Sequence, residues 1–182
     1  MDISLPTDLQ ERLRQIRLIV LDVDGVLTDG AIIYAGGDID TKEFHVQDGF
    51  GITLGRQAGL KFAVLTGRVS DAVKRRVTEL KFDYYESGHF YKQQALQDMI
   101  ARAGLAPEQV LYMGDDILDL VCKPHVGVFV APANAVERVQ READWVTQRR
   151  GGDTAVRELI DCILDIQGLL KTTENFFIGA NT

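Results

Sequence analysis

The sequence predicts an α/β fold: a Rossmann-like, doubly wound parallel sheet with helices on both faces, formed as a single domain over residues 1–182. Short apolar runs alternate along the chain with segments of helical pattern, as in successive strand–helix units. The runs are continuously apolar, which is typical of parallel strands that are buried on both faces. The 182 residues are 46% hydrophobic and contain no internal repeat or linker, which suits one domain with its own core.

The first sixty residues predict a strand, a hairpin and a helix. RLIVLD (17–22) is an apolar run and forms the first strand. AIIYAGGDIDTKEFHV (31–46) predicts a β-hairpin insertion, with two short strands around Gly36 and Gly37. DGFGITLGRQAGL (48–60) is expected to be helical, and Gly59 stands near its expected end.

The remainder of the chain continues this alternation. KFAVLT (61–66) is a strand, Ser70 is expected to cap the start of the next helix, and Gly104 is expected to cap the end of another. DTAVRELIDCILDIQGLL (153–170) is amphipathic and predicts one final helix. The other predicted elements are helices at 70–80 and 92–104, strands at 82–85, 110–116, 126–131 and 144–147, and helices between the last three strands.

Charge and composition exclude several classes of protein. The formal net charge is -7, which argues against a nucleic-acid partner, because phosphate-backbone binding needs a basic face. Cys122 and Cys162 lie far apart in helix-like segments, as core residues do in a reducing compartment. The N-terminus has no apolar signal core, and no apolar run approaches the ~18 residues of a membrane span. We therefore expect a soluble cytoplasmic protein with no membrane partner.

Polar residues stand where three of the predicted strands end: Asp22, Thr66 and Asp115. Ligands of open parallel sheets bind beyond the carboxyl ends of the strands, so these residues indicate a site. Asp24 follows Asp22 by only two residues, and neighbouring carboxylates repel each other unless a cation neutralises them. A polar turn after the strand is the simpler interpretation, and a cation bound between the two carboxylates is the more specific one.

Four motifs occur in a fixed order along the chain. They are Asp22-Val23-Asp24-Gly25, Thr66-Gly67-Arg68, Lys92, and Gly114-Asp115-Asp116 with Asp119 three residues later. Together, each at a predicted strand end or helix start, they resemble the signature of the haloacid dehalogenase superfamily of phosphotransferases. The resemblance implies a Mg²⁺-dependent phosphomonoesterase that acts through an aspartyl-phosphate intermediate.

The resemblance also implies catalytic roles. Asp22 would attack phosphorus, and Asp24 would protonate the leaving oxygen and then deprotonate the hydrolytic water. Thr66 would donate a hydrogen bond to a phosphoryl oxygen. Lys92 would place a compact positive charge against the developing negative charge.

The implied Mg²⁺ ligands are all oxygens, which suits this hard cation. They are a carboxylate oxygen of Asp22, the backbone carbonyl of Asp24 and the carboxylate of Asp115. Asp116 and Asp119 are expected to orient the metal ligands rather than to bind the ion themselves.

Each residue also has a simpler interpretation. Thr66 alone is an ordinary turn residue, Lys92 a solvated lysine at a helix start, and Asp119 an exposed helical carboxylate. For the whole chain, the alternatives to an enzyme are a receiver-type domain with a phosphoacceptor aspartate and a non-catalytic module that keeps the fold. The retention of every motif residue argues against such a module.

A closer resemblance extends over about residues 10–170, to the 3-deoxy-D-manno-octulosonate 8-phosphate phosphatase family. It is carried by DVDGVLTDG, the hairpin, FHVQDGFG, TGRVS, Arg76, Lys92, GDDILDL and RRGGDTAVREL. The family is a capless, Mg²⁺-dependent homotetramer of lipopolysaccharide biosynthesis, and the same is implied here. The implied contacts of the sugar phosphate are Asp24, His45, Val46, Gln47, Asp48, Gly49, Arg68, Arg76 and Lys92. A phosphatase for a related nine-carbon sugar acid phosphate, or for another small phosphosugar, is the alternative.

The spacing of the motifs leaves no room for a cap domain. Residues 25–65 and 67–113 hold only elements that the hairpin and the sheet require. An uncapped site is open to water unless a neighbouring subunit covers it. We therefore expect the apolar hairpin (31–46) to form an oligomer interface and the C-terminal tail (171–182) to reach a neighbour's site. A disordered end, or packing of the tail on its own subunit, is the alternative.

Overall fold

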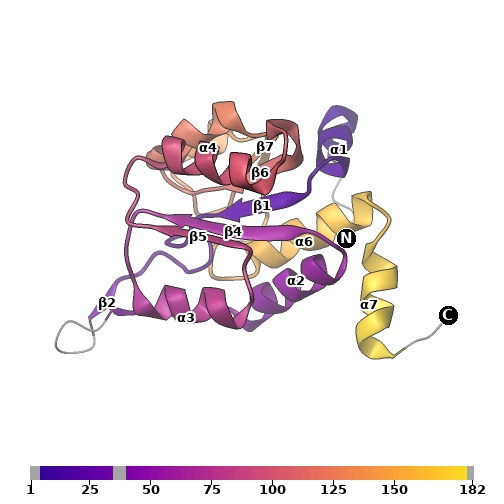
Figure 1. Ribbon diagram of the computed structural model, residues 1–182, viewed down its shortest axis with the longest axis horizontal. Helices are drawn as coiled ribbons and strands as arrows, with labels where there is room; N and C mark the ends of the chain where they lie inside the picture. Colours follow the sequence, from indigo (N-terminus) through magenta and orange to yellow (C-terminus); the bar gives the residue numbers. More distant parts are fainter. Residues whose placement is uncertain (1–4, 35–39, 180–182) are drawn as a thin grey trace.

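The computed structural model describes residues 5–34 and 40–179. Within these residues one sheet contains the strands β1 (Leu18–Leu21), β4 (Lys61–Thr66), β5 (Tyr84–Ser87), β6 (Val110–Met113), β7 (Val128–Ala131) and β8 (Trp145–Val146). All neighbouring strands of this sheet are parallel. Figure 1 shows the sheet between two layers of helices, so the predicted doubly wound fold is confirmed.

The order of the strands identifies the topology. The order is β5-β4-β1-β6-β7-β8, which places β1 in the middle of the sheet between β4 and β6. Numbered along the chain within this sheet, the order is 3-2-1-4-5-6, which is that of the Rossmann fold. Receiver-type domains follow the flavodoxin-like order 2-1-3-4-5. The receiver-type alternative is therefore wrong.

Helices cover both faces of the sheet. The helices of the described residues are α1 (Thr7–Arg14), α2 (Val46–Gln57), α3 (Asp71–Glu79), α4 (Lys92–Ala103), α5 (Glu137–Glu142), α6 (Ala155–Ile166) and α7 (Leu170–Ile178), with the 3-10 helices η1 (Pro107–Gln109) and η2 (Ile117–His125). Figure 1 shows α4 on one side of the sheet and α2, α3 and α6 on the other. Alternate residues of β1 face the two layers: Ile19 and Leu21 join the core with α2 and α6, and Leu18 and Val20 join the core with α4.

The predicted hairpin follows β1. Strand β2 (Ile33–Tyr34) pairs antiparallel with β3 (Asp40–Thr41), whereas Gly36 and Gly37 lie outside the described residues. Between β1 and β4 the described chain holds only this hairpin and α2, and between β4 and β6 it holds only α3, β5, α4 and η1. The described residues therefore contain no cap domain, as predicted.

The helix predicted over 153–170 is present as α6, but it ends at Ile166, and a separate helix, α7, begins at Leu170. Gly168 separates them with a φ of 72°, a left-handed conformation that ends helices and that glycine adopts without steric cost. Most of the predicted tail is thus helical. It packs on its own chain, where the Phe177 ring lies 5.3 Å from the Phe50 ring.

Other elements also differ from the predictions. Helix α1 was not predicted, although its buried residues Leu9 and Leu13 show the four-residue spacing of a helix face. Helix α2 begins at Val46 with His45 as its N-cap, so the predicted substrate loop is the first turn of a helix. Strand β5 begins two residues after the start of the strand predicted at 82–85.

Candidate active site

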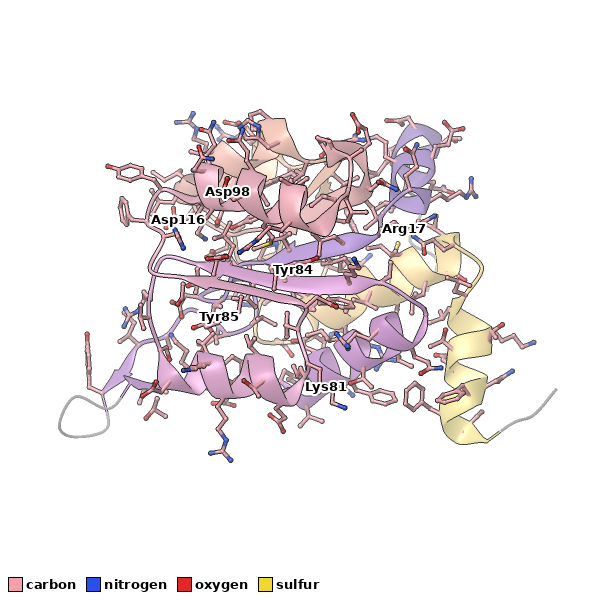
Figure 2. All side chains as sticks on the ribbon, in the orientation of Figure 1. Arg17, Lys81, Tyr84, Tyr85, Asp98 and Asp116 are labelled. Carbon is pink, nitrogen blue, oxygen red and sulfur yellow. The ribbon has the colours of Figure 1, made fainter. Side chains whose placement is uncertain are left out.

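The polar residues at three strand ends meet at the carboxyl edge of the sheet. Asp22 directly follows β1, Thr66 is the last residue of β4, and Asp115 lies two residues beyond β6. Because β4, β1 and β6 are neighbours, these side chains line one cavity of about 360 Å³. In Figure 2, Asp116 marks this end of the sheet and Arg17, which precedes β1, marks the opposite end.

The cavity collects residues from all four motifs. Eight of the predicted site residues line it: Asp22, Asp24, Thr66, Arg68, Lys92, Asp115, Asp116 and Asp119. Thr66 is buried, and its Oγ1 accepts a hydrogen bond from the backbone N–H of Arg68 at 3.3 Å. Its hydroxyl proton remains available for a group in the cavity.

Lys92 is a buried lysine at the start of α4. Its ammonium donates to Asp22 Oδ1 at 2.7 Å and to Asp119 Oδ1 at 2.6 Å, and its residue exposure is 4%. Burial alone would lower the pKa of Lys92, but the negative charges of Asp22 and Asp119 outweigh burial and raise it. The interpretation as a solvated lysine is therefore wrong, and Lys92 is a fixed positive charge beside Asp22.

Asp119 connects this lysine to the loop after β6. Its Oδ1 accepts hydrogen bonds from Lys92 and from the Tyr112 hydroxyl, the latter at 2.7 Å. Its Oδ2 accepts from the backbone N–H groups of Asp115 at 3.0 Å and Asp116 at 3.2 Å. Asp119 is 1% exposed, so the interpretation as an exposed helical carboxylate is wrong. With both oxygens engaged, it fixes the backbone that carries Asp115.

The carboxylates of the cavity are crowded. Asp22, Asp115 and Asp119 each place an oxygen within 4.8 Å of the others. Burial raises the pKa of Asp22 to about 7. The positive charge of Lys92 lowers this pKa, and the negative charge of Asp119 raises it further. Burial also raises the pKa of Asp115 to about 7, and the charges of Asp22, Asp119 and Asp116 add to that shift. One ammonium does not compensate these acids.

The donor set fits a hard divalent cation. Asp22 and Asp115 present carboxylate oxygens to the cavity, and Asp119 is already occupied by hydrogen bonds. An all-oxygen set with few protein ligands suits Mg²⁺, which keeps several waters. Gly25 allows the close approach, because a Cβ there would lie 2.0 Å from Asp115 Oδ2, and its φ is +87°.

We expect the carboxylate cluster to make stability fall as pH rises from about 4 to about 7 in metal-free buffer. Folded Asp22 and Asp115 hold protons up to a pKa of about 7, whereas unfolded aspartates release them near their ordinary pKa of 3.8. The folded state therefore binds more protons in this window, and the free energy of unfolding decreases as they leave. A loss of ~2 kcal/mol would lower the melting temperature by about 4–8 °C.

Thermal melts in EDTA and in Mg²⁺ measure this effect. Mg²⁺ binds the ionised carboxylates, so it should raise the melting temperature more near pH 7.5 than near pH 5. Asp115→Asn is the matched variant, and both the pH slope and the Mg²⁺ response should become smaller in it. A wild-type melting temperature that does not change on addition of Mg²⁺ at either pH would contradict a metal site in this cavity.

Asp24 lies at the rim of the cavity between two cations. Its Oδ1 is 2.5 Å from the Lys42 ammonium, and its Oδ2 is 3.9 Å from Arg68 Nε. Lys42 follows β3 of the hairpin, and no motif or spacing in the sequence points to it. Tyr112 was also missed, since its position within the apolar strand VLYM indicates a core residue.

The other predicted substrate contacts form a separate group away from this cavity. They are the N-cap residue His45, then Val46, Gln47, Asp48 and Gly49 in the first turn of α2, and Arg76 on α3. Arg76 donates to the backbone carbonyl of His45 at 3.4 Å and pairs with Glu79 at 3.1 Å. Gly49 leaves space for this arginine, because a Cβ there would lie 2.2 Å from Arg76 Nη2.

Asp48 is a structural cap rather than a cavity residue in this chain. It is 2% exposed, and its Oδ1 accepts from the backbone N–H of Arg157 at 2.8 Å, in the first turn of α6. Its Oδ2 is buried without a hydrogen-bond partner among the described residues. Burial raises the pKa of Asp48, while the Arg157 N–H acts against that shift. Asp48 thus joins the beginnings of α2 and α6.

Known proteins resemble this chain in sequence and in fold. The haloacid dehalogenase-like hydrolase family matches residues 84–159. The 3-deoxy-D-manno-octulosonate 8-phosphate phosphatase of Haemophilus influenzae is 39% identical over 160 residues, which cover 88% of this chain and 89% of the relative. The crystal structure of the Moraxella catarrhalis protein of the same name, in complex with magnesium ion, phosphate ion and KDO, has a TM-score of 0.90 at 34% identity and covers 93% of this chain and 98% of that one. The structure of the cobalt-bound form of the Haemophilus influenzae deoxy-D-mannose-octulosonate 8-phosphate phosphatase has a TM-score of 0.86 at 38% identity. The match covers 91% of this chain and 99% of that one.

The sheet order and the four converging motifs define a haloacid dehalogenase-like hydrolase, without a cap in the residues that the structure describes. The sequence identity to the relatives named above, and the share of each chain that the matches cover, identify the family within this class. The chain belongs to the 3-deoxy-D-manno-octulosonate 8-phosphate phosphatase family.

Proposed function

We propose that this chain hydrolyses 3-deoxy-D-manno-octulosonate 8-phosphate to the free sugar acid and phosphate, as a step of lipopolysaccharide biosynthesis. The observation that carries the proposal is the single cavity that joins Asp22, Asp24, Thr66, Lys92 and Asp115. The relatives named above carry this activity in their names, and they do not favour the nine-carbon alternative. We place the reaction in the cytoplasm. Among the described helices, none has both the length and the apolarity of a membrane span.

Asp22 is the proposed nucleophile. Lys92 donates to Asp22 Oδ1, which fixes the rotation of the carboxylate at the end of a fully buried strand. One carboxylate oxygen attacks phosphorus, the P–O bond to the sugar breaks, and an aspartyl-phosphate forms. Thr66 and Lys92 supply a hydroxyl donor and a positive charge to the phosphoryl oxygens as they accumulate negative charge.

Asp24 is the proposed acid and base. It lies two residues after Asp22 and reaches the cavity from the turn that follows β1. Its carboxyl proton goes to the departing sugar oxygen, and the resulting carboxylate then accepts a proton from the water that attacks the aspartyl-phosphate. The enzyme returns to its starting protonation state when phosphate forms.

Mg²⁺ is the proposed cofactor, held by Asp22, the backbone carbonyl of Asp24 and Asp115. When bound, it neutralises the crowded carboxylates and lets an anionic substrate approach them. The magnesium and cobalt in the related structures support this assignment. Asp116 and Asp119 act on the metal site through the loop backbone, as the hydrogen bonds of Asp119 indicate.

We also propose that the enzyme is a homotetramer in which a neighbour covers the open cavity. The hairpin exposes Ile32, Ile33 and Tyr34, with 79% of Tyr34 accessible, which is costly for an isolated chain. The predicted contacts from the first turn of α2 and from Arg76 then reach the substrate only across a subunit boundary. Light scattering at micromolar concentration should report a tetramer, and a fully active monomer would contradict this assembly.

Phosphate release from a panel of esters tests the proposed activity. The panel contains 3-deoxy-D-manno-octulosonate 8-phosphate, a nine-carbon sugar acid phosphate and a small alkyl phosphate, each with Mg²⁺ and with EDTA. We expect the highest kcat/KM for the eight-carbon ester, by about tenfold or more, and loss of activity in EDTA. A preference for the nine-carbon ester would support the alternative substrate, and no release from any ester would contradict a phosphatase.

A further inference from the structure

Lys42 of the hairpin has a buried side chain, whose ammonium lies beside Asp24 at the rim of the cavity. Lys42 directly follows β3, and its side chain is 1% exposed, although the β2 residues Ile33 and Tyr34 are exposed. Its Nζ lies 2.5 Å from Asp24 Oδ1, on the carboxylate to which the acid and base role is assigned. An ammonium is costly to bury unless a carboxylate compensates its charge, so this ion pair with Asp24 stabilises the buried position of the lysine side chain.

We propose that Lys42 is a positioning residue for Asp24, an inference that rests on the phosphatase function proposed above. The turn that carries Asp24 leaves its side chain 25% exposed, and such a carboxylate has several rotamers available. Lys42 holds one oxygen, while Arg68 lies 3.9 Å from the other. The two cations come from different segments, so together they select one orientation of the carboxylate for proton transfer.

Lys42 is placed to act through Asp24 rather than on the substrate. It is not among the residues that line the 360 Å³ cavity. Lys42 instead lines a second cavity, together with Phe44, Val46 and Ala72. The hairpin is thereby coupled to the proton-transfer group, and displacement of β3 would move the cation that holds Asp24.

Leaving-group dependence distinguishes positioning of an acid from general support of the fold. An alkyl or sugar oxygen must be protonated as it leaves, whereas p-nitrophenolate leaves without help. Values of kcat/KM report the steps up to formation of the aspartyl-phosphate, where this proton is transferred. We expect Lys42→Met to lower kcat/KM for the sugar phosphate by about 10- to 100-fold and for p-nitrophenyl phosphate by less than about threefold. Lys42→Arg should recover most of the loss.

The controls separate the possible failures. Lys61→Met makes the same chemical change at the exposed start of β4 and should leave both kinetic values unchanged. In an Asp24→Asn background, Lys42→Met should add no further loss, because the group that it positions is gone. If Lys42→Met does not fold, Lys42→Gln, which retains a donor, is measured in its place.

Equal losses on both esters, or additive losses with Asp24→Asn, would show that Lys42 only anchors the hairpin, and would overturn the inference. A wild-type protein that releases phosphate from neither ester would instead overturn the proposed function. The two failures are therefore distinguishable.

Discussion

Asp22→Asn should abolish turnover and leave the fold intact. The amide lacks the nucleophilic carboxylate oxygen, so no aspartyl-phosphate can form, and we expect kcat to fall on the order of 10⁴-fold or more. Asparagine has the size of aspartate, and its Oδ1 can still accept from Lys92, which lies 2.7 Å from Asp22 Oδ1 in the wild type. The substitution also removes one crowded negative charge, so the melting temperature in metal-free buffer near pH 7 should not fall.

Steady-state kinetics with the sugar phosphate and thermal melts measure the two parts of this prediction. Asp98→Asn is the matched control, because Asp98 lies on the outer surface of α4, where it accepts from Gln94 at 2.9 Å (Figure 2). This control should keep wild-type kcat. Intact-mass measurement verifies that the introduced asparagine has not deamidated. A verified Asp22→Asn protein with a kcat within about tenfold of wild type would exclude the covalent role.

The fold was predictable because most of its determinants are local. Continuous apolar runs such as Leu18–Leu21 are buried on both faces, and the spacing of apolar residues in α4 together with Gly104 defines a helix and its end. The break between α6 and α7 depends on Gly168, which stands inside an otherwise regular amphipathic pattern. A glycine in such a pattern is compatible with a continuous helix as well as with a stop, so the pattern alone does not decide.

Part of the site was predictable for a topological reason. The ends of parallel strands share one edge of a sheet, so polar residues that follow β1, β4 and β6 must meet if these strands are neighbours. No such rule predicts that Lys42 and Tyr112 contact the site. Lys42 reaches Asp24 from a hairpin outside the sheet, and Tyr112 presents its hydroxyl from an apolar strand. Such contacts follow from the packing of whole elements and have no signature in the spacing of residues.

Arg76 illustrates a second limit. Its helix, α3, was predicted correctly, and Ser70 caps it as expected, since Ser70 Oγ accepts from the N–H of Val73 at 3.4 Å. The side chain nevertheless binds the His45 carbonyl in the same chain. In the proposed assembly Arg76 reaches substrate only across a subunit boundary, and no local pattern in the sequence encodes the position of a neighbouring subunit.

Asp119→Asn should cause a large loss of both stability and activity, although asparagine has nearly the size and shape of aspartate. All four groups around this carboxylate are donors: the Lys92 ammonium, the Tyr112 hydroxyl, and the backbone N–H groups of Asp115 and Asp116. An asparagine has one acceptor oxygen, and its NH₂ must face one of these pairs of donors. Because the site is 1% exposed, water cannot relieve the conflict, and we expect a loss of ~3 kcal/mol in the free energy of unfolding.

The loss of activity has a separate cause. Asp119 holds both Lys92, which donates to Asp22, and the loop that carries Asp115, so the substitution disturbs the nucleophile and the metal ligand together. We expect kcat to fall by about 10²- to 10³-fold, as when a preorganised electrostatic contact is removed. The apparent Mg²⁺ affinity should weaken in the same variant, which a titration followed by melting temperature measures.

Asp116→Asn is the matched control for Asp119→Asn, because it changes a neighbouring aspartate in the same way. Asp116 Oδ1 accepts from the N–H of Ile117 at 2.6 Å and caps η2, and asparagine caps helices as well as aspartate does. The control should therefore lose less than ~0.5 kcal/mol of stability and less than about tenfold in kcat. Denaturant unfolding measures the loss of stability in both variants, and steady-state kinetics measure the loss of kcat. Similar small effects at the two positions would mean that the donors around Asp119 find other partners, and that this carboxylate does not hold the site together.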